Sequence, residues 1–164
     1  MLGCLVEDPP LYTEPTQTPP RINLRLAEPP PDRIILVDKG DPITFYIPVT
    51  SEDVGDSLTA AMFLDESVIP IRNFVQIPGS TLDDVDRRIE IVYPGLAEVG
   101  FGCHRIKIRV SHTNNLQLLG EPINQADVAE AYWWMNVIDV AAGDDGAILR
   151  NCLSGVSASG STTR

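Results

Sequence analysis

The sequence predicts an all-β fold, an antiparallel two-sheet sandwich that follows an extended, proline-rich arm. About seven short segments in which apolar and polar residues alternate, separated by polar turns, lie within about 120 residues after the arm. No segment has the 3.6-residue periodicity of a helix of ordinary length, which argues against helical bundles and α/β folds. A small β-barrel is the alternative architecture.

Residues 1–32 form a region of their own, which holds Cys4 and is rich in proline. Its eight prolines are Pro9, Pro10, Pro15, Pro19, Pro20, Pro29, Pro30 and Pro31. Because proline fixes φ and donates no backbone hydrogen bond, the region is expected to be an extended, semi-rigid stalk. Ile22, Leu24 and Leu26 alternate with polar residues, so a short strand is expected within it. A disordered arm and an arm that lies along a partner are the alternatives.

Residues 33–153 are predicted to form the sandwich. A β-branched run at 33–37 ends in a turn cluster, and a second strand follows at 43–49. Pro48 predicts an edge strand or a bulge there, because proline interrupts the hydrogen-bond ladder. Further β-like segments are expected at 58–64, 68–77 and 88–92. One helical turn is expected at 81–86.

The last two predicted strands alternate most clearly. Residues 103–110 place isoleucine and valine on one face and basic side chains on the other, which is typical of a half-buried antiparallel strand. Residues 129–138 likewise place an apolar face that includes Trp133 opposite a second face. Residues 154–164 are nearly all Ser, Gly, Thr and Ala and predict a flexible tail.

The strand pattern over residues 33–140 resembles the broad immunoglobulin-like sandwiches found in bacterial surface lipoproteins and adhesins. Cys103 stands near the start of the penultimate strand, with Phe101 two residues before it. Antibody-type domains carry a tyrosine at that earlier position, together with a tryptophan and a second cysteine in early strands. This sequence has none of the three, so the resemblance implies the fold and carries over no functional residue.

Met1-Leu2-Gly3-Cys4 resembles the lipobox of bacterial lipoproteins, whose cysteine is lipidated and becomes the mature N-terminus. No charged region or apolar run stands before these four residues in the sequence. The resemblance implies lipid on Cys4 and a membrane anchor at the envelope of a Gram-negative bacterium. Leu5 occupies the position that influences sorting, and it implies the outer membrane or the cell surface.

Three cysteines are present, Cys4, Cys103 and Cys152. If Cys4 carries lipid, the other two remain to form a disulfide, which contributes about 3–4 kcal/mol in the chain-entropy model and implies an oxidising compartment. Two unpaired thiols in a cytosolic protein are the alternative. Alternation places Cys103 on the polar face with Arg105. The bridge therefore lies on the outer face of the sheet, or a bulge at 100–102 shifts the register.

The net charge of −11 argues against nucleic-acid binding, because such a chain repels phosphate backbones. His104 and His112 lie about 26 Å apart in one extended strand, so they do not share a metal ion. Ser111 beside His112 lacks the sequence context of a nucleophile elbow. The acidic groups at 83–86 and 144–145 do not fit the spacing of an EF-hand. The sequence thus predicts a non-enzymatic protein without a cofactor or a metal.

Tyr132 and Trp134 fall on one face of the last predicted strand, opposite its apolar face. If that face is exposed, two planar aromatic rings stack on a sugar or anchor a protein partner. If both faces are buried, the arm or a neighbouring subunit covers the two rings. We therefore expect a structural or interaction module of the cell envelope. A carbohydrate-binding module and a subunit of a larger extracellular or envelope assembly, packed through its arm, are the alternatives.

Overall fold

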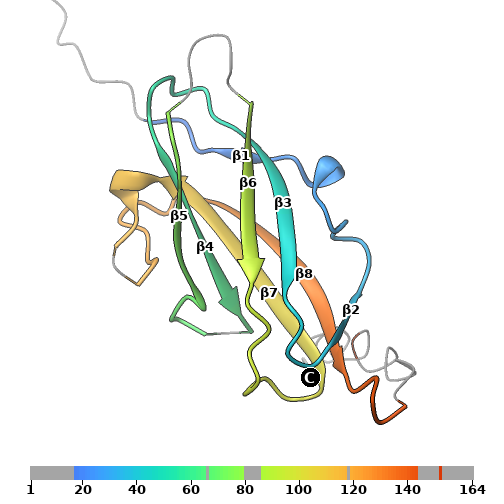
Figure 1. The fold of residues 1–164 in the computed structure, drawn as a ribbon. Helices are drawn as coiled ribbons and strands as arrows, with labels where there is room; N and C mark the ends of the chain where they lie inside the picture. Colours follow the sequence, from blue (N-terminus) through green and yellow to red (C-terminus); the bar gives the residue numbers. More distant parts are fainter. Residues whose placement is uncertain (1–16, 66, 80–85, 118, 144–151, 153–164) are drawn as a thin grey trace, which may run out of the picture.

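A computed structural model of the chain shows a two-layer β-sandwich and confirms the all-β prediction (Figure 1). The structure describes residues 17–65, 67–79, 86–117, 119–143 and 152. The described strands are β1 (Arg21–Ile22), β2 (Ile35–Asp38), β3 (Ile43–Thr50), β4 (Leu58–Leu64), β5 (Arg72–Ile77), β6 (Asp86–Tyr93), β7 (Gly102–His112) and β8 (Ala129–Ile138). Two short 3₁₀ helices, η1 (Leu24–Leu26) and η2 (Thr113–Asn115), accompany them.

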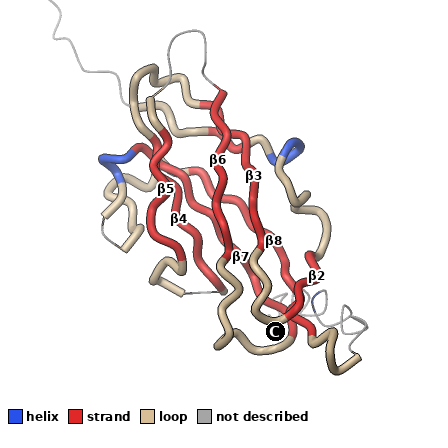
Figure 2. The backbone as a smooth tube through the Cα atoms, in the orientation of Figure 1, coloured by secondary structure: helices blue, strands red, loops and turns tan. Residues whose placement is uncertain are grey.

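The strands form two separate sheets rather than a barrel (Figure 2). One sheet has the order β1-β3-β6, and the other has the order β2-β8-β7-β4-β5. The paired strands run antiparallel except β2, which runs parallel to β8. The first two strands thus divide between the sheets, and the remaining order matches the A-B-E and G-F-C arrangement of immunoglobulin domains. The sandwich is therefore immunoglobulin-like, as the sequence predicted.

The core forms where the inner faces of the two sheets meet. Trp133 of β8 lies at its centre with no exposed surface, and its ring meets Phe45 of β3 edge-on at 5.3 Å between centroids. The predicted inner face of β7, made of Ile106, Ile108 and Val110, is also fully buried. Because the two large rings come from different sheets, their contact holds the layers together at the centre.

The arm lies against the sandwich over its described part. Arg21 and Ile22 pair with the end of β3, and Glu28 exchanges two backbone hydrogen bonds with Tyr46 further along the same strand. Between these points the chain forms η1, so the predicted strand is only two residues long. The stretch 17–32 of the predicted stalk thus contacts its own sandwich, while Cys4 and the rest of residues 1–16 lie outside the described residues.

A buried hydrogen bond attaches the arm to the core. The indole N–H of Trp133 donates to the backbone carbonyl of Pro29 at 2.7 Å. Ala27, two residues earlier in the arm, is 4% exposed and belongs to the core cluster. Since a buried indole N–H requires an acceptor, the proline-rich segment completes the core at this side of the sandwich.

Pro48 lies in neither an edge strand nor a bulge. It sits in β3, which has β1 on one side and β6 on the other, and its register with Arg88 of β6 is unbroken. The carbonyl of Pro48 accepts a hydrogen bond from Asn23 of the arm. The carbonyl and nitrogen of a strand residue point to the same side, so the missing N–H faces the arm, where pairing with β1 has ended.

Some predicted features lie outside the described residues. The tail at 154–164 is one of them. The helical turn expected at 81–86 is another, since only Asp86 of that range is described, and it is the first residue of β6. The acidic pair at 144–145 also falls outside.

The contact of Trp133 with the arm has a testable cost. Trp133→Phe removes the donor to Pro29 and leaves a small cavity, so we expect a loss of about 2 kcal/mol in the free energy of unfolding. Urea denaturation of the full chain measures it. Trp134→Phe, on the opposite face of the same strand, is the matched control and should change stability by less than about 1 kcal/mol. Equal losses in the two variants would contradict the assignment.

Candidate functional site

The outer face of the five-stranded sheet carries alternating cationic and aromatic side chains. In the register between β7 and β8, Arg105 lies opposite Trp134, and Lys107 lies opposite Tyr132. These four residues, which we call the outer-face window, point away from the core because their strand neighbours fill it. Tyr132 is 41% exposed, and the other three are half-buried.

The cations of the window lean diagonally across the aromatic rings. The Arg105 guanidinium lies 5.2 Å from the ring centroid of Tyr132, and the Lys107 ammonium lies 4.6 Å from that of Phe63 in β4. Among the described residues, no cation lies over the ring of Trp134. The cation–π contacts order the basic side chains against the sheet and hold their charge at its surface.

The connection between β7 and β8 covers one end of this face. Arg109 donates from Nη1 to the carbonyl of Gly120 at 2.6 Å, and Phe63 is only 1% exposed. Gly120 has a φ of +75°, and a Cβ there would lie 2.9 Å from the Phe63 ring. A glycine is therefore required for the loop to lie this close to the sheet.

A disulfide lies at the other end of the face. Cys103 and Cys152 are joined, with their Cα atoms 5.2 Å apart, and Cys152 is 3% exposed. The register of β7 with β8 is unbroken from Gly102 onward, so Cys103 shares the face of Arg105. Of the two arrangements that the sequence left open, the bridge on the outer face is the one present. The loop and the bridge thus frame the window.

Charged neighbours set the electrostatics at the edge of the window. Burial raises the pKa of Glu130, but hydrogen bonds from Tyr132 and Arg109, with the charges of Arg109 and Lys107, bring that pKa below its ordinary value. The hydrogen bond to Glu130, together with burial, raises the pKa of Tyr132. Glu130 also forms an ion pair with Arg109 at 2.8 Å. The Arg109 charge is thus neutralised beside the window.

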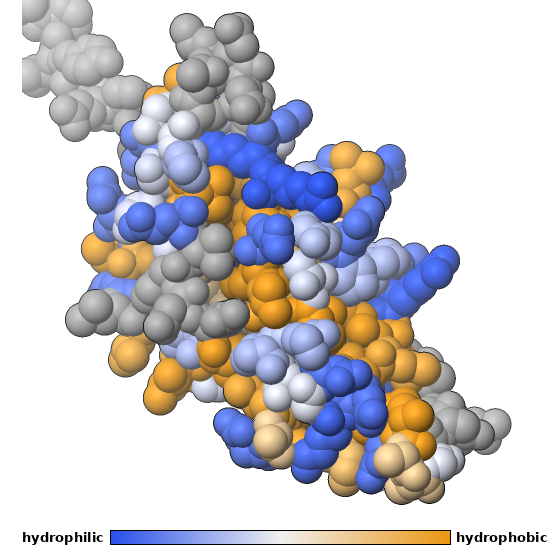
Figure 3. Space-filling model, in the orientation of Figure 1, coloured by the Kyte–Doolittle hydropathy of each residue, from blue (hydrophilic) through white to orange (hydrophobic). Residues whose placement is uncertain are grey.

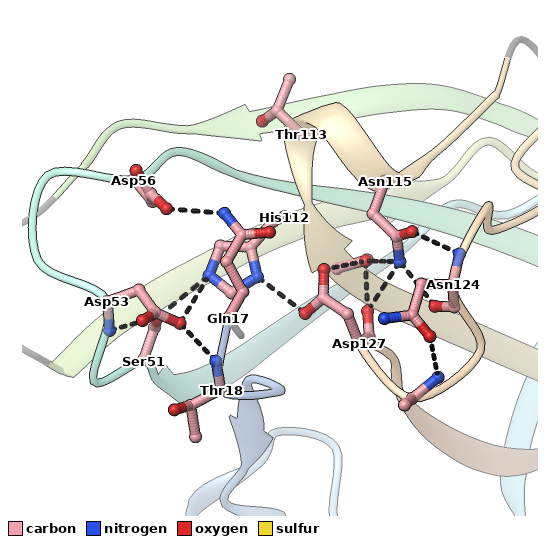
Figure 4. Close-up of polar contacts among 12 residues, drawn as sticks. Gln17, Thr18, Ser51, Asp53, Asp56, His112, Thr113, Asn115, Asn124 and Asp127 are labelled. Carbon is pink, nitrogen blue, oxygen red and sulfur yellow. Dashed lines mark hydrogen bonds and ion pairs between the residues drawn. The ribbon is translucent and has the colours of Figure 1, made fainter. Parts of the chain in front are cut away.

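A second cluster of polar side chains surrounds His112 at the far end of β7 (Figure 4). His112 is 1% exposed, and its Nδ1 lies 2.7 Å from the Asp127 carboxylate. Its Nε2 lies 3.4 Å from both Asp53 and the Ser51 hydroxyl. Asp127 is itself 3% exposed, so His112 supplies hydrogen bonding that this buried carboxylate needs.

The same cluster ties four separate segments together. Asn115 donates to the carbonyls of Asn124 and Asp127 and so fixes the loop between β7 and β8. In the arm, the Thr18 N–H donates to Asp53 at 2.8 Å, and Gln17 donates to Asp56 at 2.7 Å. The arm, the β3–β4 loop, the end of β7 and the β7–β8 loop therefore meet at this end of the sandwich.

Ser51, His112 and Asp127 have the residue types and order of contacts of a hydrolase triad. However, Ser51 is 1% exposed, and its hydroxyl also accepts a hydrogen bond from the Asp53 N–H. A cavity of about 190 Å³ beside His112 is lined by Gln17, Gly55, Asp56, Ser57, His112, Thr113 and Asn114, without Ser51. The serine therefore has no open approach, and the geometry favours a clamp between loops.

The remaining candidates from the sequence lie apart. Ser111 donates to Asp127 rather than to His112. His104, at the disulfide end of β7, contacts Asp65 at 3.0 Å and the carbonyl of Gly100 at 2.9 Å. Within the described residues, no group of three or more His, Cys, Asp or Glu side chains is placed to hold a metal ion. Over the same residues, no helix is long and apolar enough to cross a membrane.

Comparison with known proteins finds distant similarity to solved structures. No family model matches the chain, and no curated protein matches it. Among solved structures, the ASH/PapD-like domain 7 of human CEP192 aligns with a TM-score of 0.36 at 10% identity, over 85% of this chain and 98% of that one. We base the fold on the strand order and pairing alone, and nothing about function on this similarity.

The buried histidine cluster can be tested through stability. His112→Ala leaves the Asp127 carboxylate buried without its partner, so we expect a loss of about 3 kcal/mol in the free energy of unfolding. His104→Ala is the matched control in the same strand, and its loss should stay below about 1 kcal/mol because its partner Asp65 is exposed. Chemical denaturation measures both. An undiminished stability of His112→Ala would rule out the clamp.

Proposed function

We propose that this chain is a non-enzymatic interaction module of the cell envelope of a Gram-negative bacterium. It is held to the outer membrane by lipid on Cys4 and contacts a protein partner through the outer-face window. The proposal unites a means of attachment at one end of the chain with a contact surface on the folded domain.

The exposure of Tyr132 is the observation that carries the proposal. It lies in the middle of a central strand, where the opposite face is buried in the core, yet 41% of its surface is exposed. The loop at Gly120 and the bridge at Cys103 cover the sheet on either side. Exposed aromatic rings bordered by basic side chains have the composition typical of interaction hot spots.

The number of cysteines supports a lipid anchor on Cys4. The disulfide takes up Cys103 and Cys152, and Cys4 alone is left over. The disulfide also fits the oxidising environment outside the cytoplasm. Gln17 is bonded to the sandwich, so twelve residues separate it from Cys4 and span at most about 40 Å when extended. The domain would therefore stay close to the membrane.

A carbohydrate-binding module is the second candidate, and Trp134 favours it. Its ring is half-buried on the outer face, and no cation lies over it among the described residues. Tyr132 is two residues away on the same face. Two such rings can stack on the apolar faces of sugar rings. Lys107, opposite Tyr132, would bind the negative charge of an acidic sugar.

Photo-crosslinking in the native cell tests the contact surface. A photoreactive phenylalanine at Tyr132 should give one reproducible protein adduct, because this position lies in the window. The adduct should fall at least about tenfold when Trp134→Ala is added, as for a hot-spot residue. The control places the same probe at Phe101, which is 54% exposed outside the window. Equal adducts from both positions would contradict the proposal, and glycan-array binding lost in Trp134→Ala would favour the second candidate.

Intact mass spectrometry of the native protein tests the anchor. We expect a mature N-terminus at Cys4 with added acyl mass, and extraction from the membrane fraction only by detergent. Cys4→Ser should release the protein into the soluble envelope fraction without changing its disulfide. An unmodified Met1 in the native protein would contradict the lipoprotein proposal while leaving the contact surface untouched.

A further inference from the structure

A fully buried asparagine in β8 has no hydrogen-bond partner. Asn136 has no exposed surface, and within the part of the chain that the structure describes neither its Nδ2 nor its Oδ1 makes a hydrogen bond. An unsatisfied buried amide destabilises the folded state, so such groups are rare and call for an explanation. A leucine would fill the same position without this cost. Residues that break a packing rule are expected where function requires them.

Asn136 lies on the same face as the outer-face window. It follows Tyr132 and Trp134 at the two-residue period of β8, and it lies opposite Cys103 of β7 in the antiparallel register. On its other side, β2 sets Leu36 opposite Asn136 in the parallel register. Paired strand residues share a face, so Cys103, Asn136 and Leu36 form a row across three strands, which we call the bridge row.

Cys152 is held over the bridge row by its bond to Cys103. The disulfide keeps the two Cα atoms 5.2 Å apart, and Cys152 is itself 3% exposed. Leu36, at the β2 end of the same row, is 48% exposed. Figure 3 shows hydrophobic residues exposed along the side of the molecule where β2 lies. The row is thus closed at the bridge and open at its other end.

We propose that the Cys103–Cys152 bridge is a redox-controlled cover, and that its reduction extends the outer-face window to Asn136. The proposal rests on the proposed function of the window, and the occupant is an extended segment of the same protein partner. Trp134 and Asn136 are about 6.5–7 Å apart along β8, which is also the two-residue pitch of an extended peptide. The Asn136 amide offers two donors and an acceptor, which match the C=O and N–H of a peptide group.

A dithiol reductant supplies the electrons for this step. One of its thiolates attacks the sulfur of Cys103, which is half-buried and therefore more accessible than that of Cys152. The S–S bond breaks, and Cys152 leaves as a thiolate. The second thiol of the reductant displaces Cys103 from the mixed disulfide. Two electrons and two protons thus pass to the protein, which ends with two thiols, and the reductant ends as a disulfide. Cys152 is then free to leave the bridge row.

Hydrogen exchange of the Asn136 side-chain amide tests the cover in the purified full chain. With dithiothreitol as the reductant, this amide should exchange at least about tenfold faster than in the oxidised chain, because its cover is gone. The Trp133 indole N–H is the control and should stay protected in both states, because it lies in the core. An Asn136 amide that stays protected after reduction would overturn the cover. Loss of protection at Trp133 would overturn it too, because reduction would then unfold the domain.

Photo-crosslinking in the native cell tests what the opened row binds. A photoreactive phenylalanine at Leu36 should give at least about tenfold more adduct with the partner when Cys103→Ser and Cys152→Ser remove the bridge. The same probe at Tyr132 should give its adduct with and without the bridge. A Leu36 adduct that is absent, or that does not depend on the bridge, beside a constant Tyr132 adduct would overturn the cover and leave the proposed function intact. No adduct at either position would overturn both.

Asn136→Leu tests the role of the amide, and circular dichroism confirms that each variant keeps its fold. In the oxidised chain it should lower the equilibrium constant for unfolding at least about threefold, because it removes an unsatisfied buried group. In the bridge-free chain it should reduce the Leu36 adduct at least about tenfold, because the partner loses its hydrogen bonds. A less stable oxidised variant, or an undiminished adduct, would overturn the assigned role of Asn136. Glycan-array binding that appears only in the bridge-free chain would overturn the peptide as the occupant.

Discussion

The burial of one tryptophan between three parts of the chain is the constraint on which the rest of the structure depends. Trp133 comes from the five-stranded sheet and packs against Phe45 of the other sheet. Its indole N–H donates a hydrogen bond to the backbone carbonyl of Pro29 in the arm. Each contact satisfies a different need, since the ring requires apolar neighbours and the N–H requires an acceptor. Through Ala27 and Pro29 the arm thereby becomes part of the core, and it closes one side of the sandwich.

Because β-strands alternate, the position of Trp133 also decides what the outer face presents. Its neighbours Tyr132 and Trp134 must point outward, where they lie opposite the basic side chains of β7. The β7–β8 loop and the disulfide cover the two ends of that face, so what is left between them is small and defined. Core packing and the proposed contact surface therefore have a common origin in ten residues of β8.

Local patterns in the sequence were enough to predict the sandwich. The alternation in 103–110 and 129–138 placed both strands and their buried faces correctly, and the disulfide expected between Cys103 and Cys152 is present. The prediction of an edge strand or a bulge at Pro48 was wrong, because the sequence of a single strand does not reveal which neighbouring strand faces the nitrogen that lacks a hydrogen. The His112 cluster was missed because two of its partners, Ser51 and Asp127, lie 61 and 15 residues away in the chain. Such contacts depend on how loops meet after folding.

Hydrogen exchange of the two indole N–H protons tests the central claim most directly. They belong to adjacent strand residues in one protein and are resolved by NMR. The Trp133 proton, bonded to Pro29 inside the core, should exchange only with global unfolding, while the Trp134 proton on the outer face should exchange orders of magnitude faster. Equal and rapid exchange of both protons would mean that the arm is not fastened to the core.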